Sequence, residues 1–208
     1  LSATLVLVSA PAGFGKTTII ASWASQTSLP VAWFSLEKQD NDFNRFFTYF
    51  IHSLQTVESD IGNRNESLLK THQLSFEDLF GELINEINSI SRHLIVVLDD
   101  FNTIKSEKIY NALNFLIEHA PPNFHLVMAT RVDPLLPLAR FRGKGKVIEI
   151  RSDELRFSYQ ETQEYLRNIM SIELQEQHLN SLIEHTEGWI AGIQMAAVSL
   201  RNHPDINE

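Results

Sequence analysis

The feature that most constrains the fold of this chain is the segment 10–18, which reads A-P-A-G-F-G-K-T-T. It directly follows the apolar run 4–9, which is typical of a buried strand, and it opens the segment 16–26, whose apolar residues recur at helical spacing. Glycines at such a turn let backbone N–H groups converge on an anion, and the helix N-terminus adds a partial positive charge. The segment therefore predicts a Walker A phosphate-binding loop, and with it an α/β fold on a parallel sheet.

We expect the loop itself to supply most contacts to a bound nucleotide. The residues concerned are Ala12, Gly13, Phe14, Gly15, Lys16, Thr17 and Thr18. The Lys16 ammonium would reach the β- and γ-phosphates and so assist catalysis, while the Thr17 hydroxyl would ligate Mg²⁺. Ala10 stands where the usual pattern has its first glycine, although a small residue is kept there. The alternative is a glycine-rich turn with an accidental Lys-Thr pair, and the flanking strand and helix argue against it.

The rest of the chain predicts an α/β domain followed by helices. Further apolar runs predict strands at 30–36, 94–98, 126–129 and 147–150, which gives about five parallel strands. Helices are expected after Asp42, Ser75 and Ser106 on both faces of the sheet, and 58–73 is expected to be a surface connection. Beyond residue 151 only helices are predicted, at about 158–170, 174–185 and 189–201. We therefore expect a P-loop domain over 1–152 and an incomplete, lid-like helical domain over 153–208.

A second motif consists of the apolar run 94–98 and the two aspartates that follow it. Ligands gather at the carboxyl ends of the strands in open parallel sheets, and a run of this form is typical of a Walker B strand. We assign Asp99 to the Mg²⁺ ion, and Asp100 to a general base that orients the attacking water. The alternative is that Asp100 only caps the following turn.

A third candidate is Arg131, which follows the predicted strand 126–129 at the same edge of the sheet. A guanidinium there can bind a γ-phosphate through two hydrogen bonds, which would give Arg131 a catalytic role. The alternative is an ion pair with Asp133 or with the sheet edge. The chain has no Asn-Lys-x-Asp motif for guanine, which favours ATP as the nucleotide.

The composition restricts the other function classes. Cysteine is absent and the eight histidines lack metal-site spacing, so neither a disulfide nor a protein-ligated metal centre is expected. The net charge of −9 disfavours nucleic-acid binding, and we interpret the basic stretch 131–151 as a solvated loop that balances acids elsewhere. No apolar run is long enough to cross a membrane. We expect a cytoplasmic protein without membrane contact and, because the chain enters a strand at Leu1, a segment of a longer protein.

Taken together, these motifs resemble the nucleotide-binding region of the signal-transduction ATPases with numerous domains, in the branch of the maltose-regulon activator and other large LuxR-type regulators. The resemblance covers nearly the whole chain. The words that carry it, besides the Walker A loop, are A-W-F-S-L-E (32–37), D-N-D-F-N-R-F (40–46), V-L-D-D-F (97–101), T-R-V-D-P-L-L-P-L-A-R-F-R (130–142), D-E-L-R-F (153–157) and T-E-G-W-I-A-G-I-Q-M-A (186–196).

The resemblance implies that the triphosphate lies between the P-loop domain and the helical domain. Arg131 then corresponds to a sensor arginine, and Gly188 with Trp189 to the element that closes over the adenine. Ile190 stands where many relatives have proline. Helix packing by Trp189 is the alternative. It would involve Ile193, Ala196 and Leu200 as well.

The resemblance further implies a slowly hydrolysing ATP switch in a bacterial transcriptional activator, whose full-length form self-associates and binds promoter DNA through a C-terminal helix-turn-helix absent from this segment. Two alternatives stay open from the residues alone. One is a dedicated P-loop enzyme such as a kinase or motor-type ATPase. The other is an interaction module with a degenerate nucleotide site, for which Ala10 is the reason.

Overall fold

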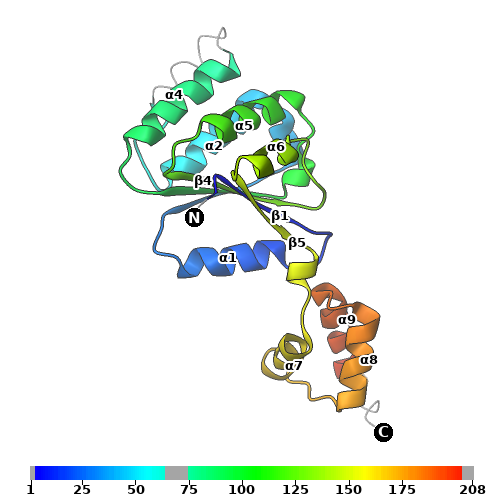
Figure 1. The fold of residues 1–208 in the computed structure, drawn as a ribbon. Coiled ribbons are helices and arrows are strands. Elements are labelled where there is room, and N and C mark those ends of the chain that lie inside the picture. The colour runs from blue at the N-terminus through cyan, green and yellow to red at the C-terminus, as the bar shows by residue number, and fades with distance from the viewer. Residues whose placement is uncertain (1–2, 64–74, 203–208) are drawn as a thin grey trace.

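A five-stranded parallel sheet forms the centre of the computed structural model, which describes residues 3–63 and 75–202 (Figure 1). The strand order is β2-β3-β4-β1-β5. The strands are β1 (Leu5–Ser9), β2 (Val31–Ser35), β3 (Leu94–Asp99), β4 (Phe124–Thr130) and β5 (Val147–Arg151). The predicted α/β P-loop fold is thus confirmed, and every predicted strand is present.

Helices cover the two faces of the sheet unequally (Figure 1). One face carries α2 (Phe43–Gln55), α4 (Phe76–Ser89), α5 (Glu107–His119) and α6 (Leu138–Gly143), and the other carries α1 (Lys16–Gln26). The larger core lies on the first face and includes the buried rings of Phe46, Phe50 and Phe80. The smaller core, against α1, includes Val8 and Ile20. Burial on both faces explains why the strands read as continuous apolar runs.

Helix starts follow the capping residues. The Asp42 carboxylate accepts a hydrogen bond from the Arg45 N–H at 2.8 Å at the start of α2. Ser75 and Asp78 form a reciprocal capping box at the start of α4. Each cap satisfies amide groups that the first turn of a helix leaves without a partner. Both N-caps are therefore confirmed. The predicted connection 58–73 lies largely outside the described residues.

The strand register brings polar residues to one edge of the sheet. Ser9 at the end of β1 is aligned with Thr130 of β4 on one side and Arg151 of β5 on the other. On β2 and β3, Ser35 is aligned with Asp99. Since the strands are parallel, the Walker A loop, the Walker B aspartates and Arg131 all leave the sheet at this edge.

The basic stretch after β4 contains a helix that the sequence did not predict. Leu138 and Phe141 of α6 are buried against the larger core, and this burial holds the short helix in place. Its basic side chains pair with acids on neighbouring elements: Arg140 with Glu118 at 2.5 Å, and Arg142 with Glu149 at 2.6 Å. The interpretation of this stretch as a balance to nearby acids agrees with these pairs, but the expected loop is partly helical.

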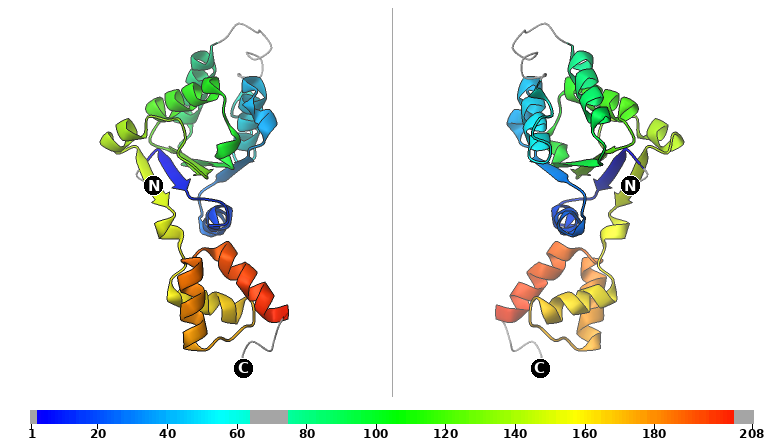
Figure 2. Two further views of the ribbon diagram at one scale, coloured as in Figure 1. Left: turned by 90° about the vertical axis from the view of Figure 1, so that its right-hand side faces the viewer. Right: turned by 90° about the vertical axis from the view of Figure 1, so that its left-hand side faces the viewer.

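The chain after β5 forms a small helical part of its own (Figure 2). The 3₁₀ turn η3 (Asp153–Leu155) leads to it, and Leu155 still packs in the smaller core at the sheet; the helical part comprises α7 (Tyr159–Asn168), α8 (Glu176–Thr186) and α9 (Ile190–Asn202). Leu166, Leu179 and Ile193 form its buried centre, apart from the two cores at the sheet. Among the described helices of the whole chain, none is long and apolar enough to cross a membrane.

Candidate phosphate-binding site

The loop between β1 and α1 has the backbone conformation of a phosphate-binding loop. Gly13 has a φ angle of 79° and Gly15 one of 72°, and this left-handed region is costly for residues with a side chain. Ala10 is not among the residues with positive φ, and its side chain is buried in the smaller core. Alanine therefore fits the first position of the motif, since neither its backbone nor its surroundings require glycine.

The Lys16 ammonium folds back over the start of the same loop. Its Nζ donates hydrogen bonds to the carbonyl oxygens of Ala10 at 2.7 Å and Pro11 at 2.9 Å. Partial burial, together with the nearby Arg131 guanidinium, lowers the pKa of Lys16 from its ordinary value. Both effects disfavour the charged form of Lys16. A bound anion would offset them, because it attracts the ammonium and so compensates for lost hydration and for the repulsion from Arg131.

The Walker A helix and the Walker B strand meet through Thr17 and Asp99. The Thr17 hydroxyl lies 2.9 Å from Asp99 Oδ2 and 3.1 Å from Oδ1, and Asp99 is buried. A hydroxyl and a carboxylate side by side are the hard oxygen donors that Mg²⁺ prefers, and Mg²⁺ commonly keeps several waters beside one or two such ligands. The residues present thus fit the predicted ion. Thr18 is exposed on the same turn of α1, whereas Phe14 packs against the smaller core.

Asp100 and Arg131 face each other across the end of the sheet. Asp100 has a left-handed backbone with φ of 52°, which is uncommon outside glycine and is found preferentially at functional sites. Its amide donates to Asp99 Oδ1 at 2.9 Å. The Asp100 carboxylate and the Arg131 guanidinium lie 3.8 Å apart, with side chains 52% and 54% exposed. Each group is open to solvent and close enough to respond to a ligand placed between β3 and β4.

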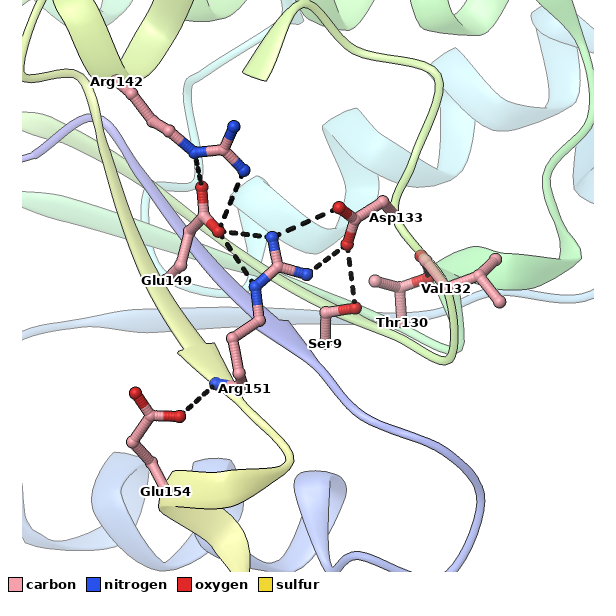
Figure 3. A network of polar contacts seen from close by, with 8 residues as sticks. All are labelled: Ser9, Thr130, Val132, Asp133, Arg142, Glu149, Arg151 and Glu154. Atoms are coloured by element: carbon pink, nitrogen blue, oxygen red, sulfur yellow. Dashed lines mark hydrogen bonds and ion pairs between the residues drawn. The ribbon is translucent and has the colours of Figure 1, made fainter. Parts of the chain in front are cut away.

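The alternative ion pair between Arg131 and Asp133 does not form in this structure, in which both residues are described. Asp133 instead pairs with Arg151 and accepts a hydrogen bond from the Ser9 hydroxyl at 3.2 Å (Figure 3). Hydrogen bonding to Arg151 lowers the pKa of Asp133. Arg151 also pairs with Glu149 of its own strand. Through its pair with Asp133, the guanidinium joins β5 to the loop after β4. Asp133 is therefore engaged elsewhere, and the ion pair of Arg131 is the long contact to Asp100.

The segment before α9 reaches the Walker A loop from the helical part. The Trp189 indole Nε1 donates to the Ala12 carbonyl at 3.0 Å, and the backbone N–H of Ala191 donates to the Gly13 carbonyl at 3.2 Å. Gly188 lies instead against the backbone of Phe157, whose N–H donates to the Gly188 carbonyl at 2.9 Å. Trp189 thus contacts the loop backbone, while contact of Gly188 or Trp189 with a nucleotide stays a prediction.

Sequence reasoning missed Asn41, which holds the segment after the Walker B aspartates. The Asn41 side chain donates to the Thr103 carbonyl at 3.0 Å and accepts from the amides of Lys105 at 2.6 Å and Ser106 at 3.1 Å. The word D-N-D contains this residue, but nothing in its spacing reveals partners more than sixty positions away.

No family model matches the chain. It is 33% identical over 198 residues to the HTH-type transcriptional regulator MalT of Yersinia enterocolitica, covering 95% of this chain and 22% of the relative. The MalT of Yersinia pestis gives the same identity and coverage. The chain therefore spans about a fifth of the length of these curated relatives.

Solved structures share the fold at low sequence identity. The Orc1 protein of Aeropyrum pernix in complex with DNA has a TM-score of 0.53 and 12% identity, covering 99% of this chain and 56% of Orc1. A single-residue variant of Thermotoga maritima RuvB has a TM-score of 0.51 and 16% identity, covering 96% and 54%. AMPPCP-bound DnaA from Aquifex aeolicus has a TM-score of 0.50 and 14% identity, covering 94% and 55%. By sequence and fold, the chain is a P-loop nucleotide-binding region homologous to a segment of the MalT transcriptional regulators.

Proposed function

We propose that this chain is an ATP-binding, slowly hydrolysing switch module of a transcriptional activator. The observation that carries the proposal is the convergence of Lys16, Asp99, Asp100 and Arg131 at the carboxyl edge of one parallel sheet. These residues come from three separate segments of the chain, yet Lys16 lies close enough to the other three to interact with their charges. Such a cluster provides cations for phosphates, a carboxylate for a metal ion and a second carboxylate for water.

In this proposal the left-handed Gly13 and Gly15 allow the loop amides to bind the phosphates, together with Lys16. Thr17 and Asp99 would hold Mg²⁺, which when bound neutralises phosphate charge. Asp99 already occupies a fixed position, because it accepts hydrogen bonds from the Thr17 hydroxyl and the Asp100 amide. These hydrogen bonds orient the oxygen donors that would face the ion.

Arg131 would distinguish ATP from ADP. Its pairing with Asp100 at 3.8 Å is long and solvent-exposed, and such ion pairs contribute little to the free energy of folding. A γ-phosphate would offer Arg131 a charge-assisted hydrogen bond, which contributes about 1.5 to 3 kcal/mol. Shifting a two-state equilibrium from 1:99 to 99:1 requires about 5.5 kcal/mol, so two or three contacts made only to the γ-phosphate would suffice.

Asp100 would orient the attacking water and accept its proton. Its carboxylate is half exposed and lies near Arg131, whereas Asp99 is buried and bonded to Thr17, so the two acids would take separate tasks. When Arg131 turns to the γ-phosphate, the long ion pair with Asp100 would break and leave the carboxylate free to bind the water. Hydrolysis would then end the signal, which is the role of a timer.

The relatives support the regulatory setting of this switch. The similar MalT proteins are named as transcriptional regulators of the helix-turn-helix type, and the DnaA structure of the same fold contains the ATP analogue AMPPCP. We infer that the longer protein acts on promoter DNA through a separate domain and self-associates in one nucleotide state. This would place the module in the cytoplasm, away from membranes.

Turnover kinetics test the switch against a dedicated P-loop enzyme. A switch predicts tight ATP binding followed by slow phosphate release that small-molecule acceptors do not stimulate. Phosphate release can be followed with a coupled optical assay, with Asp100→Asn as the control for contaminating ATPases. Rapid multiple turnover, or transfer of phosphate to an added acceptor, would replace the switch by a motor-type ATPase or a kinase.

A further inference from the structure

Four successive carbonyl groups of the Walker A loop each accept a hydrogen bond. Lys16 donates to Ala10 and Pro11 from within the loop. The next two carbonyls, of Ala12 and Gly13, accept instead from the helical part more than 170 residues later in the chain. The loop backbone is thus held by its own lysine on one half and by the segment before α9 on the other.

The two donors from the helical part differ in kind. One is the Trp189 indole, whose Nε1 lies 3.0 Å from the Ala12 oxygen. The other is the Ala191 amide, 3.2 Å from the Gly13 oxygen. Ala191 lies in the first turn of α9, where amides have no partner within the helix. Both donors therefore bind the loop without giving up another hydrogen bond within the described fold.

The contact leaves no room for a side chain at residue 13. A Cβ placed on Gly13 would lie 2.6 Å from Trp189 Nε1 and 2.7 Å from Ala191 Cβ. Both distances are shorter than nonbonded contacts allow. The helical part otherwise packs mainly on itself, around the centre formed by Leu166, Leu179 and Ile193 (Figure 2). This point of close packing therefore makes the loop sensitive to the position of α9.

We propose that Trp189 and Ala191 are positioning residues that clamp the phosphate-binding loop by its carbonyl groups. In the peptide unit the carbonyl and the N–H of the next residue point in opposite directions. Fixing the Ala12 and Gly13 carbonyls on α9 thus fixes the amides of Gly13 and Phe14 toward the other side, where phosphate oxygens would bind. The inference rests on the proposed function, and it identifies how the helical part senses the nucleotide.

The clamp predicts reciprocal coupling. If an ordered loop binds phosphate better, then phosphate binding must favour the clamped position of α9 by the same free energy. The helical part would therefore respond to the loop itself, through main-chain hydrogen bonds, whether or not Trp189 touches the base. A change in nucleotide binding would then change the position of the helical part, and the reverse.

Calorimetry of ATP binding to this chain separates a donor role of Trp189 from simple packing. Trp189→Phe keeps an aromatic ring but removes the N–H, and loss of one hydrogen bond predicts about 3- to 10-fold weaker ATP binding. Trp189→Ala should weaken binding at least as much. Ala191→Val adds bulk beside Gly13 and should also weaken binding, whereas Met195→Val, at an exposed position of the same helix, should not.

A spectroscopic measurement adds a readout that a merely structural role would not change. The chain has three tryptophans, so Trp23→Phe with Trp33→Phe leaves Trp189 as the only one. The clamp predicts that ATP changes the emission of Trp189, and that Ala191→Val reduces this change while the unfolding temperature stays the same.

The outcomes distinguish the two proposals. If the unsubstituted chain does not bind ATP, the proposed function fails, and the clamp with it. If the chain binds ATP and Lys16→Ala abolishes binding, but Trp189→Phe and Ala191→Val bind as tightly as the unsubstituted chain, the clamp alone is wrong. Binding of ATP without any change in Trp189 emission would also overturn it.

Discussion

The Thr17 hydroxyl donates to the Asp99 carboxylate across 2.9 Å, which joins the first turn of α1 to the end of β3. The two residues are 82 positions apart in the sequence. Their contact brings the Walker A and Walker B motifs into one group of oxygen atoms, and the predictions for the metal ion depend on it.

Asp99→Asn should remove the Mg²⁺ dependence of ATP binding. The amide keeps the shape of the side chain but lacks the negative charge that a divalent ion requires. We expect ATP affinity measured with excess Mg²⁺ to fall about 10-fold or more, toward the value measured with EDTA. Thr17→Ser, which retains the hydroxyl, should bind close to normally. A full Mg²⁺ effect in Asp99→Asn would show that the ion is held elsewhere.

Asp100→Asn should slow hydrolysis strongly while leaving the fold intact. Asparagine tolerates the left-handed backbone that Asp100 adopts, so the free energy of unfolding should change by less than about 1 kcal/mol. Loss of a general base typically slows a reaction by about 100- to 10,000-fold. Single-turnover phosphate release measures the effect. Asp100→Val provides the opposite pattern, since a β-branched residue is strained at this φ angle and should destabilise the protein. Unchanged hydrolysis in Asp100→Asn would leave this residue a turn cap.

Arg131→Ala should weaken the binding of ATP but not of ADP. The guanidinium is half exposed and its ion pair with Asp100 is long, at 3.8 Å, so its removal costs the fold little. Loss of one charge-assisted hydrogen bond to the γ-phosphate predicts about 10- to 150-fold weaker ATP binding. Titration calorimetry with each nucleotide gives the ratio directly. A matched control is Arg140→Ala, whose guanidinium pairs with Glu118. An equal loss for ATP and ADP would contradict a sensor role.

His125 should make the fold less stable in mild acid. Burial lowers the pKa of the His125 imidazole, which is enclosed at the start of β4. The unfolded chain therefore binds a proton first, so this contribution to stability is complete above about pH 6.5 and is lost as the pH falls below it. The slope from this group cannot exceed about 1.4 kcal/mol per pH unit. Urea unfolding between pH 5 and 7 should show a shallower slope in His125→Asn.

The hydrogen bonds of His125 define which ring nitrogen carries the proton in the neutral form, while burial is what makes a second proton unfavourable. Its Nδ1 lies 2.9 Å from the Ala3 carbonyl, which can only accept, so the neutral ring donates there. Its Nε2 is then an acceptor, and it lies 3.0 Å from Nδ1 of His93. His119→Asn, at an exposed position of α5, serves as the control and should retain the slope of the unsubstituted chain. Identical slopes in all three proteins would assign the acid sensitivity to other groups.

The sheet and most helices were predictable because buried positions require apolar residues, and these recur along the sequence at the spacing of a strand or a helix. The strand 94–98 is apolar throughout because both faces of β3 are covered. Helix α6 was missed since it is short and basic, and Pro137 and Gly143 at its ends are typical of a loop. Only Leu138 and Phe141, three residues apart and both buried, signal its apolar face.

The edge of the sheet at which the candidate residues lie was predictable from the sequence, but their contacts with one another were not. Motif and strand order placed Lys16, Asp99 and Arg131 at one edge. The partner of Asp133 depends on the register of β5, which no local pattern reveals, and this register presents Arg151 to it. Likewise, Ala191 contacts the Gly13 carbonyl through its backbone amide. Almost every residue type has this amide, so the sequence does not indicate the contact.

Calorimetric titration of ATP with Mg²⁺ into this chain and into Lys16→Ala tests the central claim most directly. The account predicts saturable binding of one ATP per chain, and at least about 100-fold weaker binding when the ammonium and its contacts to two phosphates are removed. Circular dichroism should show the same fold for both proteins. Equal affinity in the two proteins, or no binding to the unsubstituted chain, would contradict the assignment of this loop as the phosphate-binding loop of a nucleotide site.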